Sequence, residues 1–417
     1  MRILHLSQES PMKGHQHGGL GIFLENLLRC QAKMGYDVTI LCVNIHSIEF
    51  MNIKYDGYRV VQVGNSLYKT YSGHTFYQKT INRLLLTGLL NVLGKEEFDL
   101  IHLHDSYLFD IAFSALHLFK CPVVSTSHLS FILEYMYRPG GHYAVFEHEV
   151  ETEKCMLTQS HAVTTCSKSY ADDLKRHYRL DRDVIPVLNG IDFEKFQKIK
   201  PNYELVKLHA GTRKPVYFCG RLTKNKGVGL VIEAIKKCPD HFFFVISNFA
   251  PDLVPTYDLA RELRDLKKYG YTNYLWLNEC FGEQFGILKA CVMSLIPTIS
   301  KEPFGIVGLE TLACGVTPIS TRTGGLSEFL DDSNSIKCDR NADSLIDKIN
   351  NFQHDPKLEK NGLQTAKAMS WERTTEQYME VYENVRKDFQ FDNRRNSGPD
   401  HAHKDCGFQG RAAPALP

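Results

Sequence analysis

The feature that most constrains this fold is a repeated alternation of short β-rich segments with helical ones. A first series of expected strands, with helical stretches such as 22–35 between them, lies at 2–6, 37–43, 99–104, 122–127 and 162–167. Repetition of strand, helix and strand predicts parallel sheets with helices on both faces. We therefore expect an α/β architecture.

A second series of the same kind follows "VIPVLNGIDFEKF" (184–196), with expected strands at 215–220, 242–247, 294–300 and 316–320. A Pro- and Lys-rich stretch at 198–215 separates the two series. The length of 417 residues also favours two domains, because it exceeds what one core usually holds. We predict two Rossmann-like, doubly wound domains, 1–188 and 189–370, which face a central cleft at the carboxyl ends of their strands.

Composition narrows the class of protein. The 49 Lys and Arg residues balance 48 Asp and Glu residues, which argues against a nucleic-acid partner. The amino terminus lacks the pattern of a signal peptide and no apolar stretch is long enough to span a bilayer, so we expect a cytoplasmic protein. The 12 cysteines lack the paired spacing of a zinc site and are expected in the core. Residues 390–417 are expected to form a disordered tail.

The stretch "KEPFGIVGLE" (301–310) carries two glutamates, Glu302 and Glu310, around a Phe-Gly pair. Pro303 restricts Glu302 to extended conformations, so we expect a strand, a loop at 301–305 and then a short helix. That helix is predicted from about Ile306 to Cys314, with Gly315 as its left-handed stop.

The start of this helix is a candidate anion site. Its first amide groups, those of Gly305, Ile306 and Val307, have no acceptor within the helix. A carboxylate on each side of a phosphate site suits a ligand with hydroxyl groups on both sides of its phosphates, such as a nucleotide sugar. The alternative is that Glu302 and Glu310 are simply solvated on an exposed helix.

Two other patterns bear on the class of enzyme. "GGLG" (18–21) follows the first expected strand and permits close approach of a ligand to the backbone, but it lacks the G-x-G-x-x-G spacing of a nicotinamide enzyme. His102 and His104 share one face of a strand, and no third metal ligand with suitable spacing is evident. We therefore predict no bound metal and interpret this pair as structural or pocket-lining.

Several stretches together resemble one enzyme family. "EPFGIVGLE" resembles the E-x₇-E signature of the retaining glycosyltransferases of GT-B fold known as GT4. Further matching stretches follow in family order: "GGLG" (18–21), "DLIHLHD" (99–105), "STSH" (125–128), "NGID" (189–192), "GRLTKNKG" (220–227), "GGLSE" (324–328), and "SWE" (370–372) with "YMEVYENV" (378–385). The resemblance covers residues 1 to about 388 and implies a closing helix at 371–388 that completes the first domain.

The resemblance implies roles for individual residues. It makes His128 and Glu302 the catalytic residues, beneath and beside the transferred sugar. Donor-binding residues by the same resemblance are Gly19, Gly21, Arg221, Lys226, Phe304, Gly305, Ile306, Val307 and Glu310, with the two cations on the diphosphate and Glu310 on the ribose. The donor is expected to be a UDP-sugar, with no further cofactor. The stretches 247–252 and 278–291 depart from the family pattern, so no contact to the base is assigned.

The acceptor is expected to meet the first domain. Its loops carry many carboxylates and few cations, which disfavours a phosphorylated or lipid acceptor and favours a small cationic polyol. Acceptor-side candidates are Glu9, His17, Asp105 and Glu134. The chain is also similar to the N-acetylglucosaminyltransferases that act on 2-deoxystreptamine in aminoglycoside antibiotic biosynthesis, which implies transfer from UDP-GlcNAc. The alternatives are a nucleotide-sugar epimerase of GT-B fold and a GT4 enzyme acting on another sugar, on inositol or on a lipid-linked acceptor.

Overall fold

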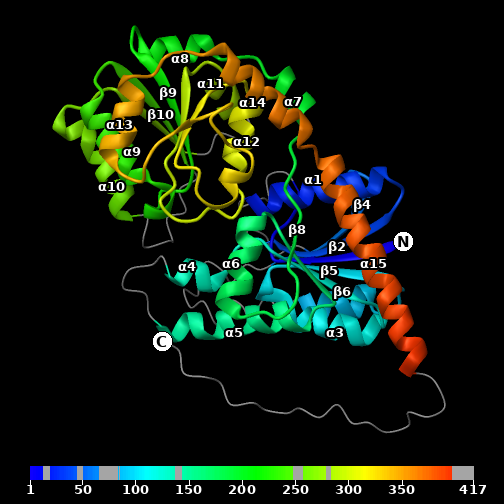
Figure 1. Cartoon of the computed structure of the whole chain (residues 1–417). Coiled ribbons are helices and arrows are strands. Elements are labelled where there is room, and N and C mark those ends of the chain that lie inside the picture. Colours follow the sequence, from blue (N-terminus) through cyan, green and yellow to red (C-terminus); the bar gives the residue numbers. More distant parts are fainter. Residues whose placement is uncertain are drawn as a thin grey trace.

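The computed structural model describes residues 1–12, 19–44, 50–64, 83, 85–136, 143–247, 257–278 and 283–396. The chain forms two α/β units, each built on its own sheet with helices packed against it, as Figure 1 shows. The predicted fold class, two parallel-sheet Rossmann-like domains, is confirmed. The predicted boundaries at 188/189 and 370/371 stay a prediction.

The first sheet contains eight strands in the spatial order β3-β4-β2-β1-β5-β6-β7-β8. The strands are β1 (Arg2–Ser7), β2 (Asp37–Asn44), β3 (Met51–Tyr55), β4 (Tyr58–Gly64), β5 (Leu100–His104), β6 (Val123–Ser127), β7 (Ala162–Thr165) and β8 (Ile185–Pro186). The helices of this unit are α1 (Gly19–Lys33), η2 (Leu89–Leu93), η3 (Ser106–Leu108), α3 (Phe109–Phe119), α4 (Phe131–Met136), α5 (Tyr143–Gln159) and α6 (Lys168–Tyr178). Only β3 runs antiparallel to its neighbour.

The second sheet contains six parallel strands in the order β11-β10-β9-β12-β13-β14. The strands are β9 (Lys214–Cys219), β10 (His241–Ser247), β11 (Tyr274–Asn278), β12 (Met293–Ile296), β13 (Pro318–Ser320) and β14 (Ile336–Lys337). The helices are α7 (Phe193–Lys198), α8 (Tyr203–Ala210), η4 (Lys224–Lys226), α9 (Val228–Lys237), α10 (Tyr257–Asp265), η6 (Leu266–Tyr269), α11 (Gln284–Lys289), α12 (Ile306–Ala313), η7 (Gly324–Glu328), α13 (Ala342–Asn350) and α14 (Pro356–Ala368). Every residue of β10 is buried, as expected for a strand covered on both faces.

Some elements differ from the sequence prediction. The expected strand at 294–300 ends at Ile296, because Pro297 follows it and cannot donate to a neighbouring strand. The edge strand β3 was not predicted, since its central residues are exposed and its sequence "MNIKY" lacks a clear apolar alternation. The scattered cysteines are free thiols in the described part of the chain, and most of them are buried.

The closing helix α15 (Trp371–Asn396) runs from the second unit back along the first, where Figure 1 draws it in orange and red beside α1. Trp371, Tyr378 and Tyr382 are buried against the first unit. The expected disordered tail from residue 390 is wrong for 390–396, which are helical. Close to that end, the Phe389 ring packs 5.0 Å from His161 and anchors the helix. Residues 397–417 lie outside the described residues.

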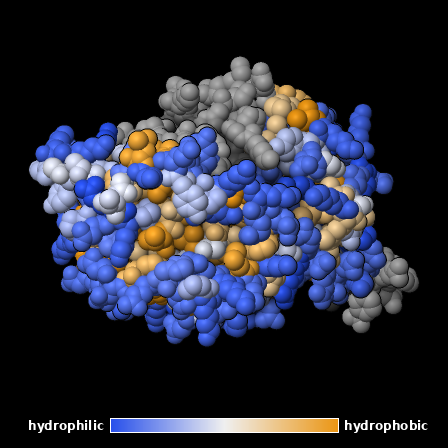
Figure 2. Space-filling model, turned by 90° about the horizontal axis from the view of Figure 1, so that it is seen from above, coloured by the Kyte–Doolittle hydropathy of each residue, from blue (hydrophilic) through white to orange (hydrophobic). Residues whose placement is uncertain are grey.

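Polar side chains cover most of the face of the molecule that Figure 2 shows. Figure 2 shows one face from above, with apolar side chains gathered in the middle and polar ones around them. Tyr203 and Leu208 of α8 are among the exposed large apolar side chains. None of the helices in the described ranges combines the length and the apolar character that a membrane span requires.

We expect α15 to be required for the stability of the first unit. Trp371→Ala removes a ring that is 3% exposed and lies 5.8 Å from the Phe23 ring. The free energy of unfolding should fall by about 3–5 kcal/mol, the usual cost of truncating a buried Trp. Urea unfolding followed by circular dichroism measures this. The control Tyr269→Ala, at a side chain that is 76% exposed, should have little effect, and an equal loss in both variants would contradict the prediction.

Candidate active site

The loop that carries Glu302 is held by an unusually close approach of two backbone segments. The Gly325 amide donates to the Glu302 carbonyl oxygen at 2.8 Å. A Cβ atom at Gly324 would lie 2.3 Å from the same oxygen, so only glycine fits there. The "GGLSE" stretch, which forms η7, therefore holds the Glu302 loop in place.

Lys226 reaches Glu302 from a different strand end. The Lys226 Nζ lies 2.8 and 2.7 Å from the two carboxylate oxygens of Glu302. Gly227, at φ +75°, allows this approach, because a Cβ there would lie 2.0 Å from the Pro297 carbonyl oxygen. The side chains are 27% and 11% exposed, so the two charges neutralise each other in a partly dry setting.

Helix α12 starts at this pair. It begins after Gly305, which has φ +88°, and no side chain caps it, so its first amide groups face outward from the helix end. The helix ends at Ala313 and Gly315 has φ +70°, in agreement with the predicted helix and its left-handed stop. Glu310 lies one turn inside, and burial raises the pKa of its carboxyl group to about 8.

Other predicted donor-binding residues also lie in the second unit, and the predicted catalytic residue His128 lies in the first. Phe304 is buried in the core beside α12. Arg221 is exposed directly after β9. Ile306 packs against the apolar cluster of the first unit that contains Phe23, and the Phe23 ring lies 4.6 Å from the His128 ring. The start of α12 and His128 are therefore brought to the same region between the units.

Asp105 positions the loop that carries His128. Its Oδ1 accepts hydrogen bonds from the amides of His128 at 2.7 Å and Leu129 at 3.4 Å. Asp105 itself has φ +60°, uncommon for a residue other than glycine, and burial raises the pKa of its carboxyl group to about 7. Its predicted contact with an acceptor stays a prediction.

Glu9 organises the beginning of α1. Its Oε2 accepts from the Gly21 amide at 2.9 Å, next to the exposed Gly19. His17 lies outside the described residues, and so do most of 247–252 and part of 278–291. Glu134 belongs to α4, but its side chain lies outside the described part of the chain.

The structure adds a third histidine to the pair predicted from sequence. His5 of β1 lies opposite His102 of β5 in register, and His104 is two residues further on the same face. The expectation that no third side chain accompanies the pair is wrong: one ligand atom from each ring lies within 4.8 Å of the others. Both ring nitrogens of each of the three are already engaged in hydrogen bonds. The arrangement is thus a polar network in a dry core.

Contacts between the units were also missed from sequence. Lys301, next to Glu302, binds the buried Asp173 of α6 at 2.7 Å. The Glu328 carboxylate accepts the amides of Lys168 and Ser169 at the start of α6. These residues come from distant parts of the chain, and only the folded arrangement of the units shows that they meet.

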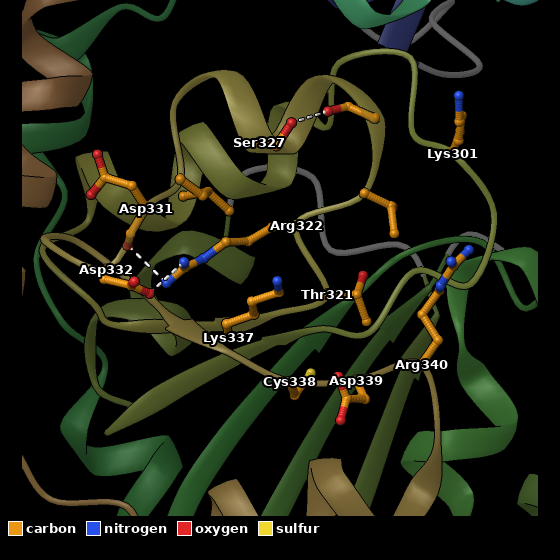
Figure 3. Close-up of a pocket in the computed structure, with 13 residues that line it drawn as sticks. Lys301, Thr321, Arg322, Ser327, Asp331, Asp332, Lys337, Cys338, Asp339 and Arg340 are labelled. Atoms are coloured by element: carbon orange, nitrogen blue, oxygen red, sulfur yellow. Dashed lines mark hydrogen bonds and ion pairs between the residues drawn. The ribbon is translucent and has the colours of Figure 1, made fainter.

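A cavity of about 700 Å³ opens beside this region, on the side of β13 and β14. Figure 3 shows Arg322 within it, reaching toward Asp331 and Asp332. Arg322 binds the Asp332 carboxylate at 2.6 Å, and Lys301 is committed to Asp173. Two of the cations that line this cavity are thus already paired, as Lys226 is with Glu302, and Lys337 and Arg340 line it as well.

Comparison with known families assigns the class. The model of "Glycosyltransferase Family 4" matches residues 17–195, and that of "Glycosyl transferases group 1" matches residues 200–369. The chain belongs to the glycosyltransferases of the group 1 and family 4 type. Both glutamates, Lys226 and Arg221 lie within the second match, and His128 lies within the first.

Individual relatives agree with this assignment. This glycosyltransferase is 26% identical over 415 residues to the alpha-maltose-1-phosphate synthase of Mycolicibacterium smegmatis, covering 92% of this chain and 100% of that protein. The sucrose-phosphate synthase of Thermosynechococcus elongatus superposes with a TM-score of 0.79 at 18% identity, covering 92% and 98% of the two chains. The HepE protein of Anabaena in complex with UDP and glucose superposes with a TM-score of 0.70 at 16% identity, covering 92% and 100%. The fold is therefore GT-B.

The carboxyl group of Glu310, whose side chain is partly buried, should make the free energy of unfolding of this glycosyltransferase fall as pH rises. The folded pKa is about 8 against an ordinary value of 4.5, so between these pH values the folded form retains a proton that the unfolded chain releases. The free energy of unfolding therefore decreases as pH rises from about 4.5 to about 8. Glu310→Gln should remove this contribution and be more stable than wild type at pH 8 by about 1–2 kcal/mol, since the half-buried group keeps some hydration.

Urea unfolding of both proteins at pH 5 and pH 8 measures the effect. Asp105 and Glu153 also have raised pKa values because of burial, and they contribute equally to wild type and variant. The difference between the two proteins should therefore shrink at pH 5. A difference that is the same at both pH values would contradict the assignment to the Glu310 proton.

Proposed function

We propose that this glycosyltransferase moves GlcNAc from UDP-GlcNAc to a hydroxyl group of a small acceptor, with retention of the anomeric configuration. The observation that carries the proposal is the Lys226–Glu302 ion pair at the uncapped start of α12. It places a cation, a carboxylate and the uncapped backbone amide groups of α12 within one small region. A nucleotide sugar offers a complementary group to each of these.

On the donor side, the diphosphate would replace Glu302 as the partner of Lys226. Arg221 and the first amides of α12 would share the phosphate charge. Glu302, released from Lys226, would accept hydrogen bonds from hydroxyl groups of the sugar. Glu310, one turn further along α12, would bind the ribose hydroxyls.

The reaction would take place on one face of the sugar. The bond from the anomeric carbon to the diphosphate oxygen breaks, and a bond to the acceptor oxygen forms on the same side. The proton of the acceptor hydroxyl passes to the departing phosphate oxygen. Negative charge grows on the diphosphate as the bond breaks, and the fixed charges of Lys226 and Arg221 stabilise it. His128 would lie against the sugar, which the two units enclose and shield from water.

The proposed acceptor is an aminocyclitol of the 2-deoxystreptamine type. Its ammonium groups would suit the carboxylates of the first unit, among which Asp105 contacts the His128 loop and Glu9 lies at the start of α1. Asp110 and Glu151 are exposed on helices and are better explained by solvation. The choice of GlcNAc and of this acceptor rests on the similarity to the 2-deoxystreptamine N-acetylglucosaminyltransferases of aminoglycoside antibiotic biosynthesis.

A mass-spectrometric transfer assay tests the proposal. The purified protein is incubated with UDP-GlcNAc or UDP-glucose and with 2-deoxystreptamine, inositol phosphate or no acceptor. We expect a GlcNAc adduct of 2-deoxystreptamine. Conversion of UDP-GlcNAc without any acceptor would indicate an epimerase, and transfer only to inositol phosphate would contradict the proposed acceptor.

A pair of variants tests the role of Glu302 in the same assay. Glu302→Ala should lower turnover by about 100-fold or more, the usual effect of removing a group that stabilises the transition state. UDP binding should remain, because Lys226 is retained. The matched control Glu376→Ala, at an exposed position of α15, should leave turnover unchanged. Turnover that survived Glu302→Ala would show that this residue has been misassigned.

A further inference from the structure

A line of buried polar side chains connects α1 to His128. The Gln31 Oε1 lies 2.9 Å from His5 Nε2. The other nitrogen of His5, Nδ1, lies 3.0 Å from His104 Nε2. His104 Nδ1 in turn lies 3.2 Å from His128 Nε2. Three imidazole rings thus form an unbroken series of hydrogen bonds that ends at the proposed sugar site.

Burial keeps the rings of this series neutral. It lowers the pKa of His5 and of His128 to about 3, and that of His104 well below its ordinary value. A neutral imidazole has one N–H donor and one nitrogen that only accepts. Each ring must therefore donate a hydrogen bond through one nitrogen and accept one through the other. The group that accepts from His5 thus determines which nitrogen of His128 carries the proton.

The orientation of the Gln31 amide determines which group His5 meets. Its nitrogen lies 3.9 Å from the Met379 sulfur and 3.3 Å from the Tyr382 hydroxyl. A hydroxyl group can donate or accept, but a thioether sulfur can only accept. The amide NH₂ group therefore faces Met379, and the carbonyl oxygen of Gln31 faces His5.

The consequences follow ring by ring. Because the Gln31 oxygen only accepts, His5 carries its proton on Nε2 and accepts on Nδ1 from His104 Nε2. His104 then accepts on Nδ1 from His128 Nε2. The proton of His128 is thereby held on Nε2, and its Nδ1 is left with a lone pair. Within the described residues no hydrogen bond reaches this Nδ1, and the side chain is only partly buried.

We propose that Gln31 is a positioning residue that fixes the tautomer of His128 through His5 and His104. The fixed tautomer presents a hydrogen-bond acceptor, and not a donor, to the ligand. His128 Nδ1 would then select a hydroxyl group of the donor sugar over a group that can only accept, such as a carboxylate. This last step rests on the proposed function, whereas the tautomer itself does not.

The same three histidines could instead be considered as a metal site, since one nitrogen from each of His5, His102 and His104 lies within 4.8 Å of the others. The hydrogen bonds decide against it. His102 binds the Tyr382 hydroxyl at 2.5 Å and Thr126 Oγ1 at 2.6 Å, so both of its nitrogens are engaged. Both nitrogens of His5 and His104 are engaged as well. A metal ion would have to break this network.

The proposal is tested by ¹⁵N NMR of the protein labelled at its histidines. Protonated and unprotonated imidazole nitrogens resonate far apart, and the signals of His128 are identified by their loss in His128→Asn. In wild type we expect a protonated Nε2 and an unprotonated Nδ1. In Gln31→Leu, which removes the amide from the series and leaves no acceptor in its place, we expect signals of both tautomers.

Tyr382→Phe is the matched control. It removes one hydroxyl group from the same buried cluster and is similarly destabilising, but it leaves the bond from Gln31 to His5 in place. His128 should keep its single tautomer in this variant. A protonated Nδ1 in wild type, an unchanged tautomer in Gln31→Leu, or an equal change in both variants would overturn the proposal. Zn²⁺ retained by the purified protein through these histidines would overturn it as well.

The kinetic consequence is measured with the same variants. In Gln31→Leu, kcat/KM for the donor should fall by about 3- to 10-fold, the effect of one neutral hydrogen bond, and it should be unchanged in Tyr382→Phe. An equal fall in both variants would indicate a merely structural role and overturn the proposal. A different result is that NMR shows the expected His128 tautomer but the protein uses no nucleotide sugar. This result would refute the proposed function and would leave the proposed role of Gln31 intact.

Discussion

The ion pair between Lys226 and Glu302 is the interaction on which the rest of the proposed site depends. Its two members follow neighbouring strands, β9 and β12, and a third segment after β13 supports the Glu302 loop from behind. Glycines at positions 227 and 324 make these approaches possible, because any Cβ would collide with a backbone oxygen. The pair concentrates charge at the start of α12, where phosphate binding is favoured by free amide groups.

The first unit contributes a buried hydrogen-bond network to the proposed site. This network runs from Gln31 through His5 and His104 to His128. Asp105 accepts a hydrogen bond from the His128 amide and so holds the loop that carries His128. Helix α15 covers this network, and its two buried tyrosines and Met379 belong to it. The closing helix therefore does more than join the units, since its Met379 also orients the Gln31 amide.

The sequence predicted those features of the fold that depend on neighbouring residues in the chain. The two α/β series, helix α12 with its stop at Gly315, and the approximate positions of nine strands follow from apolar periodicity and from glycine and proline. The strands β3, β4, β8, β11 and β14 were not predicted. The sequence could not predict His5 beside His102, because that depends on which strands are neighbours and in what register. The contact of Lys301 with Asp173 joins residues far apart in the chain and was missed for the same reason. The length of α15 was underestimated, since the helix continues to Asn396, beyond the contacts of Arg386 with Asp99 and of Phe389 with His161.

The central claim is that the start of α12, with Lys226 and Arg221, binds the diphosphate of a nucleotide. Calorimetric titration with UDP tests it most directly. The account predicts one UDP bound per chain, and about 10-fold weaker binding or worse in Lys226→Met and in Arg221→Met, the cost of losing a charged hydrogen bond. Lys224→Met, at an exposed lysine of the same short helix η4, should bind UDP as wild type does. Equal affinity in all three variants, or no binding of UDP by the wild type, would contradict the account.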